Sequence, residues 1–136
     1  MLINNKEVHI SQLTPEEVNE LTPFRDPESV SYVTDAVVDI EGMNFQPAYD
    51  FETIDDETKL TCIYLTAEKG GEDVLERIFA WKDRIVEKYD CEPWTDEYEQ
   101  PDYNGEFGYE GDDDHWTLYI STNSFNLDYD IRITID

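Results

Sequence analysis

The stretch from Asp90 to Asp114 combines carboxylates with aromatic rings in a way that suits binding of positively charged groups. It holds eleven Asp or Glu residues and no Lys or Arg. Carboxylates pair with Lys and Arg, and aromatic rings attract the same cations and anchor interfaces. We therefore expect a contact surface for a basic partner at these residues: Trp94, Asp96, Glu97, Tyr98, Glu99, Asp102, Tyr103, Glu106, Phe107, Tyr109, Glu110, Asp112, Asp113 and Asp114. The plainer interpretation is a solvated loop whose charges only keep the protein dissolved.

A second acidic region lies between Arg25 and Lys59, where ten acids occur without a basic residue. Its polar turn adds three residues to the expected contact surface: Asp55, Asp56 and Glu57. Strand periodicity would also place acids on exposed strand faces, namely Asp35, Asp39, Glu41, Asp50, Glu52, Asp128 and Asp130. Alternate residues on one strand face repeat every ~6.8 Å, and neighbouring strands lie ~4.8 Å apart. If these rows adjoin, they could imitate the regular phosphate charge of a nucleic acid.

Other chemistries have little support in the sequence. The segments Glu110–Asp114 and Asp55–Glu57 are rich in oxygen ligands, but neither has the spacing of a calcium-binding loop. His9 and His115 are the only histidines, and no motif for a catalytic metal, a phosphate-binding loop or a serine nucleophile is present. We expect no cofactor, no metal ligand set and no enzymatic activity.

The overall charge defines the kind of partner. The chain carries 34 acids against 9 bases, a formal net charge of -25. Direct binding to nucleic acid or to anionic membranes is disfavoured, because both depend on Lys and Arg. An aromatic content of 13% separates the chain from disordered acidic proteins. We found no membrane-length apolar run and no secretion signal, so we expect a cytoplasmic protein with Cys62 and Cys91 unpaired.

A few elements must position these acids. Thr14, Pro15 and Glu17 predict a capped, short N-terminal helix that ends before Pro23. Apolar spacing predicts one long amphipathic helix from Glu72 to Tyr89. Strands are expected over these ranges: 32–41, 45–53, 59–66, 116–122 and 128–136. The predicted fold is a single α+β domain over residues 1–136, in which an antiparallel sheet of about five strands carries the long helix on one face.

Three functions fit this chain. In composition it is similar to the small, very acidic inhibitors that phages encode against restriction and CRISPR systems. That resemblance implies a mimic of DNA or RNA that occupies the basic nucleic-acid-binding cleft of a target protein. The alternative is an immunity protein that neutralises a co-encoded toxin such as a basic nuclease. A second alternative is an acidic, halophile-type domain without a basic partner. The sequence does not predict the oligomeric state.

Overall fold

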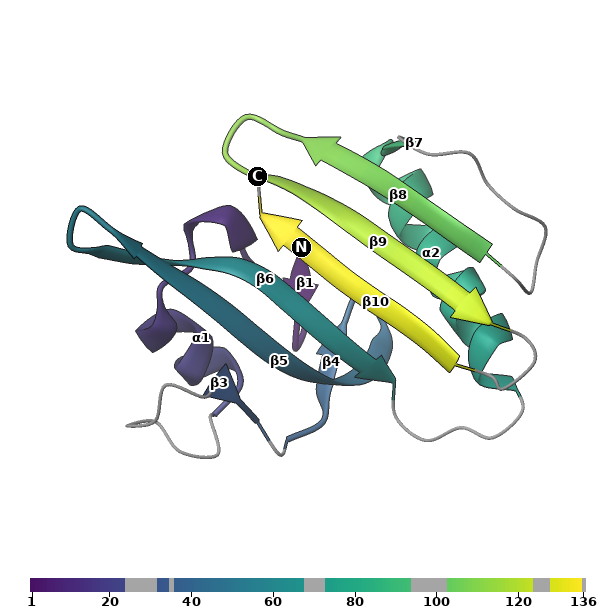
Figure 1. The fold of residues 1–136 in the computed structure, drawn as a ribbon, viewed down its shortest axis with the longest axis horizontal. Coiled ribbons are helices and arrows are strands. Elements are labelled where there is room, and N and C mark those ends of the chain that lie inside the picture. The colour runs from purple at the N-terminus through teal and green to yellow at the C-terminus, as the bar shows by residue number, and fades with distance from the viewer. Residues whose placement is uncertain (24–31, 35, 68–72, 94–102, 124–127, 136) are drawn as a thin grey trace.

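The computed structural model describes residues 1–23, 32–34, 36–67, 73–93, 103–123 and 128–135 (Figure 1). Within these ranges the elements are β1 (Leu2–Ile3), β2 (Lys6–Glu7), a 3₁₀ helix η1 (Ile10–Gln12), α1 (Pro15–Leu21), β3 (Tyr32–Val33), β4 (Val38–Ile40), β5 (Met43–Ile54), β6 (Glu57–Ala67), α2 (Val74–Tyr89), β7 (Glu92–Pro93), β8 (Tyr103–Glu110), β9 (His115–Asn123) and β10 (Asp128–Ile135).

The ten described strands form one antiparallel sheet in the order β2-β1-β4-β5-β6-β10-β9-β8-β7, and β3 pairs with β5 beside this path. The sheet curls into a half-barrel, with α2 behind β8 and β9 in the view of Figure 1. The predicted α+β fold with about five strands is therefore wrong, because sheet predominates. Five described strands are longer than the rest, namely β5, β6, β8, β9 and β10. The other strands have only two or three residues each, too few to give a clear period-two pattern in the sequence.

The helices lie close to where local signals predicted them. The Thr14 hydroxyl accepts from the Glu17 backbone N–H, and the Glu17 side chain accepts from the Thr14 backbone N–H, which completes the predicted capping box. The long helix begins at Val74 and ends at Tyr89, where Asp90 adopts a left-handed conformation. Both helices pack their apolar side chains into the same core as the sheet.

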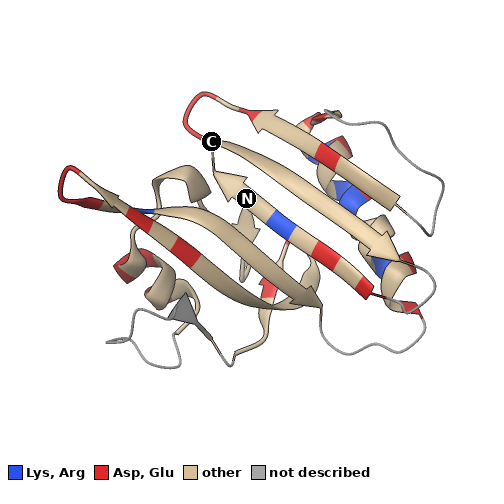
Figure 2. Ribbon diagram, in the orientation of Figure 1, with Lys and Arg blue, Asp and Glu red and all other residues tan. Residues whose placement is uncertain are grey.

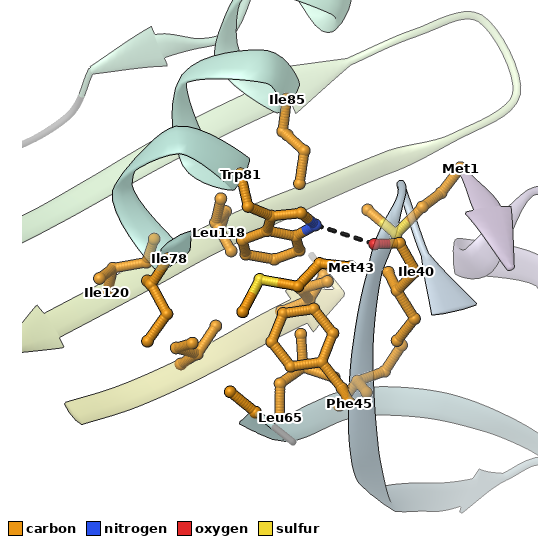
Figure 3. Packing of buried hydrophobic residues seen from close by; sticks show 14 of the residues in the cluster. Met1, Ile40, Met43, Phe45, Leu65, Ile78, Trp81, Ile85, Leu118 and Ile120 are labelled. Atoms are coloured by element: carbon orange, nitrogen blue, oxygen red, sulfur yellow. Dashed lines mark hydrogen bonds between the residues drawn. The ribbon is translucent and has the colours of Figure 1, made fainter. Parts of the chain in front are cut away.

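The core of the half-barrel is centred on Trp81 of α2 (Figure 3). Its side chain is fully buried, and its indole Nε1 donates a hydrogen bond of 2.8 Å to the backbone carbonyl of Ile40 on β4. The ring meets Phe45 of β5 edge-on, with 4.8 Å between the ring centroids. Leu118 and Ile120 of β9 enter the core from the other half of the sheet. Trp81 thus connects strands from both halves of the sheet to the helix.

Two positions on the strands depart from the usual local preference of their residues. Asn-Gly pairs favour hairpin turns, but Asn104-Gly105 lies within β8, where Gly105 pairs with Ile120. A β-carbon on Gly105 would come within 2.6 Å of the Tyr103 hydroxyl, so this ring covers the glycine. Proline usually occurs at sheet edges or bulges, but Pro47 lies on β5 inside the sheet, and the irregularity of β5 falls at Asp50 and Phe51. Pro47 is tolerated because the pairings of β5 with β3 and β4 leave a gap beside it.

A candidate partner-binding surface at the acidic end of the sheet

The acidic turns of the protein gather at one end of the sheet (Figure 2). The β5–β6 turn lies beyond the end where β10 finishes, because Cys62 in the middle of β6 pairs with Thr134 near the end of β10. The β8–β9 turn lies at the same end, because Trp116 at the start of β9 pairs with Ile135. We call this region the acidic end, and it comprises the exposed residues Asp55, Asp56, Glu57, Glu110, Asp112 and Asp113.

The acidic end has almost no counter-charge from the protein itself. Among the described residues, the one basic group that pairs with it is Lys59, whose Nζ lies 3.6 Å from Glu57 Oε2. Both of these side chains are more than half exposed, so the pair contributes little to stability. The other carboxylates of the acidic end have no ion pair with a described Lys or Arg. Their charge is therefore free to attract an external cationic group.

Three of the four basic residues of α2, namely Arg77, Lys82 and Lys88, pair with carboxylates outside the acidic end. Lys82 is buried, pairs with Asp83 at 2.7 Å, and places its Nζ 5.1 Å from the centre of the Tyr103 ring. Lys88 pairs with Glu41 at 3.0 Å. In Figure 2 the blue segments of the helix lie behind the sheet, away from the acidic end. These basic residues therefore do not neutralise the acidic end.

Asp114 does not belong to the exposed surface, although the sequence placed it there. Its side chain is buried, and its Oδ1 accepts a 2.9 Å hydrogen bond from the backbone N–H of Ser11 on η1. The neighbouring Asp113 carbonyl accepts from the Gln12 side chain at 2.7 Å. Asp114 therefore fastens the β8–β9 turn to the N-terminal segment, and its role in the described fold is structural.

We predict that Asp114→Ala lowers the free energy of unfolding by about 1–3 kcal/mol, because the buried Ser11 N–H loses its acceptor. Chemical denaturation followed by circular dichroism measures this change. Asp112→Ala is the matched control, since Asp112 is exposed, and its effect should stay within about 0.5 kcal/mol. Equal effects of the two variants would contradict the assigned role of Asp114.

The remaining candidates from the Asp90–Asp114 stretch fall into three groups. Tyr103 and Phe107 are buried in the core, so their rings are not presented to solvent. Glu106 and Tyr109 are half-buried on β8. Six candidates lie outside the described residues: Trp94, Asp96, Glu97, Tyr98, Glu99 and Asp102. The aromatic residues in the described part of this stretch thus support the core more than they line an interface.

A hollow of about 400 Å³ adjoins the acidic end between α2, β7 and β8. Its walls are formed by two tyrosine rings, three carboxylates and one glycine, namely Tyr89, Asp90, Glu92, Gly108, Tyr109 and Glu110. Asp90 and Glu92 were not among the residues singled out from the sequence. The sequence indicated them only through their position in an acid-rich stretch. Their place beside β8 depends on the pairing of Glu92 with Gly108.

The acids on the strand faces do not form the regular array that the sequence allowed. Asp50 on β5 and Asp130 on β10 are separated by β6, whose Tyr64 lies opposite Arg132. Arg132 pairs with Asp130 at 3.0 Å and stacks on Tyr119, so a positive charge occupies the middle of the outer face. A hydrogen bond to Asp50 raises the pKa of Tyr64 to about 12. On the outer face, Asp50 is therefore separated from Asp130 by Tyr64, and Asp130 is neutralised by Arg132.

Two more of the acids expected on exposed strand faces are Glu41 and Asp35. Glu41 was expected on an exposed acidic face, but its side chain is only 6% exposed. Its carboxylate accepts hydrogen bonds from the Tyr89 hydroxyl and from the Leu2 backbone N–H, besides pairing with Lys88. Asp35 lies outside the described residues. Glu41 is consequently part of the fold's interior, where sequence periodicity alone could not place it.

Cys62 and Cys91 are both buried and unpaired, and burial raises the pKa of the Cys91 thiol to about 11. Across the described ranges, no group of three His, Cys, Asp or Glu side chains is arranged to hold a metal ion. In the part of the chain that the structure describes, no helix has the length and apolar character needed to cross a membrane.

Comparison with known proteins identifies no relative. No family model matches the chain, and neither a curated protein nor a solved structure shows significant similarity to it.

Proposed function

We propose that the protein is an acidic inhibitor that acts in the cytoplasm by binding the basic nucleic-acid-binding cleft of a target protein. One observation carries the proposal: the exposed carboxylates of the acidic end project from one end of the sheet with almost no counter-charge among the described residues. Such a surface attracts cationic grooves and speeds association with them. The target would lose access to nucleic acid because its Lys and Arg side chains pair with these carboxylates.

An immunity protein against a basic toxin is the second candidate, and the distribution of charge favours it in one respect. The outer face of the sheet has Arg132 and Tyr64 at its centre, so the exposed acids of the acidic end lie on separate turns and not in a continuous array. Acidic turns suit a toxin's active site or a small adjoining site, where a few residues supply most of the binding energy. A nucleic-acid mimic would distribute the binding energy over more carboxylates.

Affinity capture from host lysate at low and high salt tests the first proposal. We expect basic nucleic-acid-binding proteins to be captured at low salt, and to be displaced by added duplex DNA or RNA. Mass spectrometry identifies the captured proteins. Capture that is insensitive to salt, or a bound protein that nucleic acid cannot displace, would contradict an inhibitor of a nucleic-acid-binding cleft. A captured toxin whose binding is confined to one small patch would favour the immunity function.

With the captured protein in hand, we predict that Asp112→Asn combined with Asp113→Asn slows association about threefold to tenfold at low salt. Dissociation should change less, because exposed charges act mainly through steering. Glu76→Gln combined with Glu87→Gln is the matched control, since it removes the same charge from exposed positions on α2. Stopped-flow kinetics across a salt series measures both rates. Equal slowing by the two double variants would show that only net charge matters and not the acidic end.

A further inference from the structure

The hairpin formed by β5 and β6 extends beyond the rest of the sheet. β5 and β6 pair as far as Ile54 and Glu57, whereas the pairing of β6 with β10 stops at Cys62 and Thr134. Among the described strands, the tip of this hairpin therefore pairs only with itself, as Figure 1 shows at the left of the molecule. We call residues 53–58 the arm. At its base, the Leu60 N–H donates to the Leu13 carbonyl at 3.1 Å, and the Leu60 side chain is buried.

The arm is held in one conformation before any partner arrives. Across its two strands, the Thr53 and Thr58 hydroxyls share a hydrogen bond of 2.7 Å. Asp55 and Asp56 have positive φ angles of 53° and 65°, as in the tight two-residue turns that match the twist of paired strands. A preformed arm loses little conformational freedom when it binds, so more of its contact energy appears as affinity.

Ile54 is the most exposed large apolar side chain among the described residues, at 61%. It lies at the end of β5, directly before Asp55 in the turn and opposite Glu57 on β6. A single exposed isoleucine is ordinary on a protein surface. Here, however, it lies next to the tip of a projecting hairpin whose turn is acidic. An apolar contact encircled by charged groups is the usual composition of an interface anchor and its rim.

We infer that the arm inserts into the partner, with Ile54 entering an apolar pocket and Asp55, Asp56 and Glu57 pairing with Arg or Lys at its rim. This inference rests on the proposed function, since it names the part of the acidic end that enters the basic target. The target site is thus a groove that combines an apolar floor with flanking cations. A purely cationic groove would leave the Ile54 side chain without a complementary contact.

The identity of the turn residues is consistent with this role. Asparagine followed by glycine is the most favourable pair for a turn with two positive φ angles. Asp tolerates this conformation less well than glycine, and two adjacent carboxylates also repel each other. The arm thus carries charge at a position where a neutral pair would give a more stable turn. Such a departure from local preference is expected where binding requires the charge.

Two synthetic peptides test the inference directly: acetyl-Arg-Arg-Leu-Arg-Arg-amide and the same peptide with serine in place of leucine. We expect the unmodified protein to bind the leucine peptide about fivefold more tightly than the serine peptide, because partial burial of one leucine side chain contributes about that much affinity. Ile54→Ser should abolish this preference while keeping the arginine-dependent part of binding. Val37→Ser is the matched control, because Val37 is the next most exposed large apolar residue at 47%. Dissociation constants come from nuclear magnetic resonance titrations that also locate the perturbed residues.

A second pair of variants separates binding from turn stability. Asp55→Asn combined with Asp56→Gly should raise the melting temperature but weaken binding of both peptides about threefold or more. Asn5→Gly alters the β1–β2 turn, whose Asn4 and Asn5 also have positive φ, and should leave peptide binding unchanged.

The outcomes distinguish this inference from the proposed function. If the leucine preference persists in Ile54→Ser, or if the peptides perturb residues away from the arm, the inference is wrong while an acidic inhibitor remains supported by salt-dependent capture. If the arm shows the expected preference but capture from lysate yields no basic protein, the proposed function is wrong. If neither peptide binds the unmodified protein, the arm is not an attachment point for arginine-rich grooves.

Discussion

Replacing Trp81 with alanine is expected to lower the free energy of unfolding by about 3–5 kcal/mol, the usual cost of removing a large aromatic side chain from a core. Trp81 is fully buried and packs against Phe45. The variant also removes the donor that satisfies the buried Ile40 carbonyl. Loss of this magnitude is a large fraction of the stability of a typical small domain. Urea denaturation followed by far-ultraviolet circular dichroism measures the change.

Two further variants separate the contributions of packing and hydrogen bonding at Trp81. Trp81→Phe keeps a ring in the core but cannot donate to Ile40, so it should cost less than Trp81→Ala. Glu76→Ala, at an exposed position of the same helix, should change stability by no more than about 0.5 kcal/mol. A Trp81→Ala variant that is as stable as Glu76→Ala would show that the helix does not pack on the sheet in the described position.

The second large effect is expected at Glu41, where Glu41→Gln should cost about 1.5–3 kcal/mol at neutral pH. Glutamine can still accept from Tyr89 and Leu2, but it loses the charge that strengthens both hydrogen bonds and pairs with Lys88. Arg84→Met, one helical turn before Lys88 on the exposed side of α2, is the control. We expect that control to remain within about 0.5 kcal/mol of the unmodified protein.

The pH dependence of this effect has a defined sign. Burial alone would raise the pKa of Glu41, but hydrogen bonds from Tyr89 and Leu2 and the charge of Lys88 more than offset it, so the pKa is lowered below its ordinary value of 4.5. A lowered pKa stabilises the folded state above the pKa of the unfolded chain, and this contribution is lost as pH falls through the folded-state value. The stability difference between the unmodified protein and Glu41→Gln should therefore shrink below about pH 4.5. A difference that grows on acidification would contradict the ion pair.

Elements with a complete local signal were predictable from the sequence. The capping box at Thr14 and Glu17 lies within four residues, and the apolar stripe of α2 repeats every turn. Strand β8 was missed although its residues alternate, since Tyr103, Gly105 and Phe107 are buried and Asn104 is exposed. The density of acids in the surrounding stretch favoured a surface loop, and Asn104-Gly105 imitated a turn. Tertiary pairing with β9 overrides that turn preference.

The candidate site was predictable only where the relevant neighbours are close in the sequence. The β5–β6 turn was expected from Asp55 and Asp56 themselves, and its charge needed no distant partner. Asp114 and Glu41 were misjudged because their partners, Ser11 and Lys88, lie far away along the chain. Whether a carboxylate is exposed or buried depends on these long-range contacts, which period-two patterning does not report.

The position of β10 has a consequence for how the protein forms during synthesis. β10 follows every other described strand along the chain, yet it lies between β6 and β9 in the sheet. While the ribosome is still making the preceding residues, the edges of β6 and β9 that β10 will occupy have no partner. Nascent intermediates of this kind expose strand edges that favour aggregation until β10 is added. The dense negative charge of the chain opposes such self-association, so the same carboxylates that we propose for binding also protect the unfinished protein.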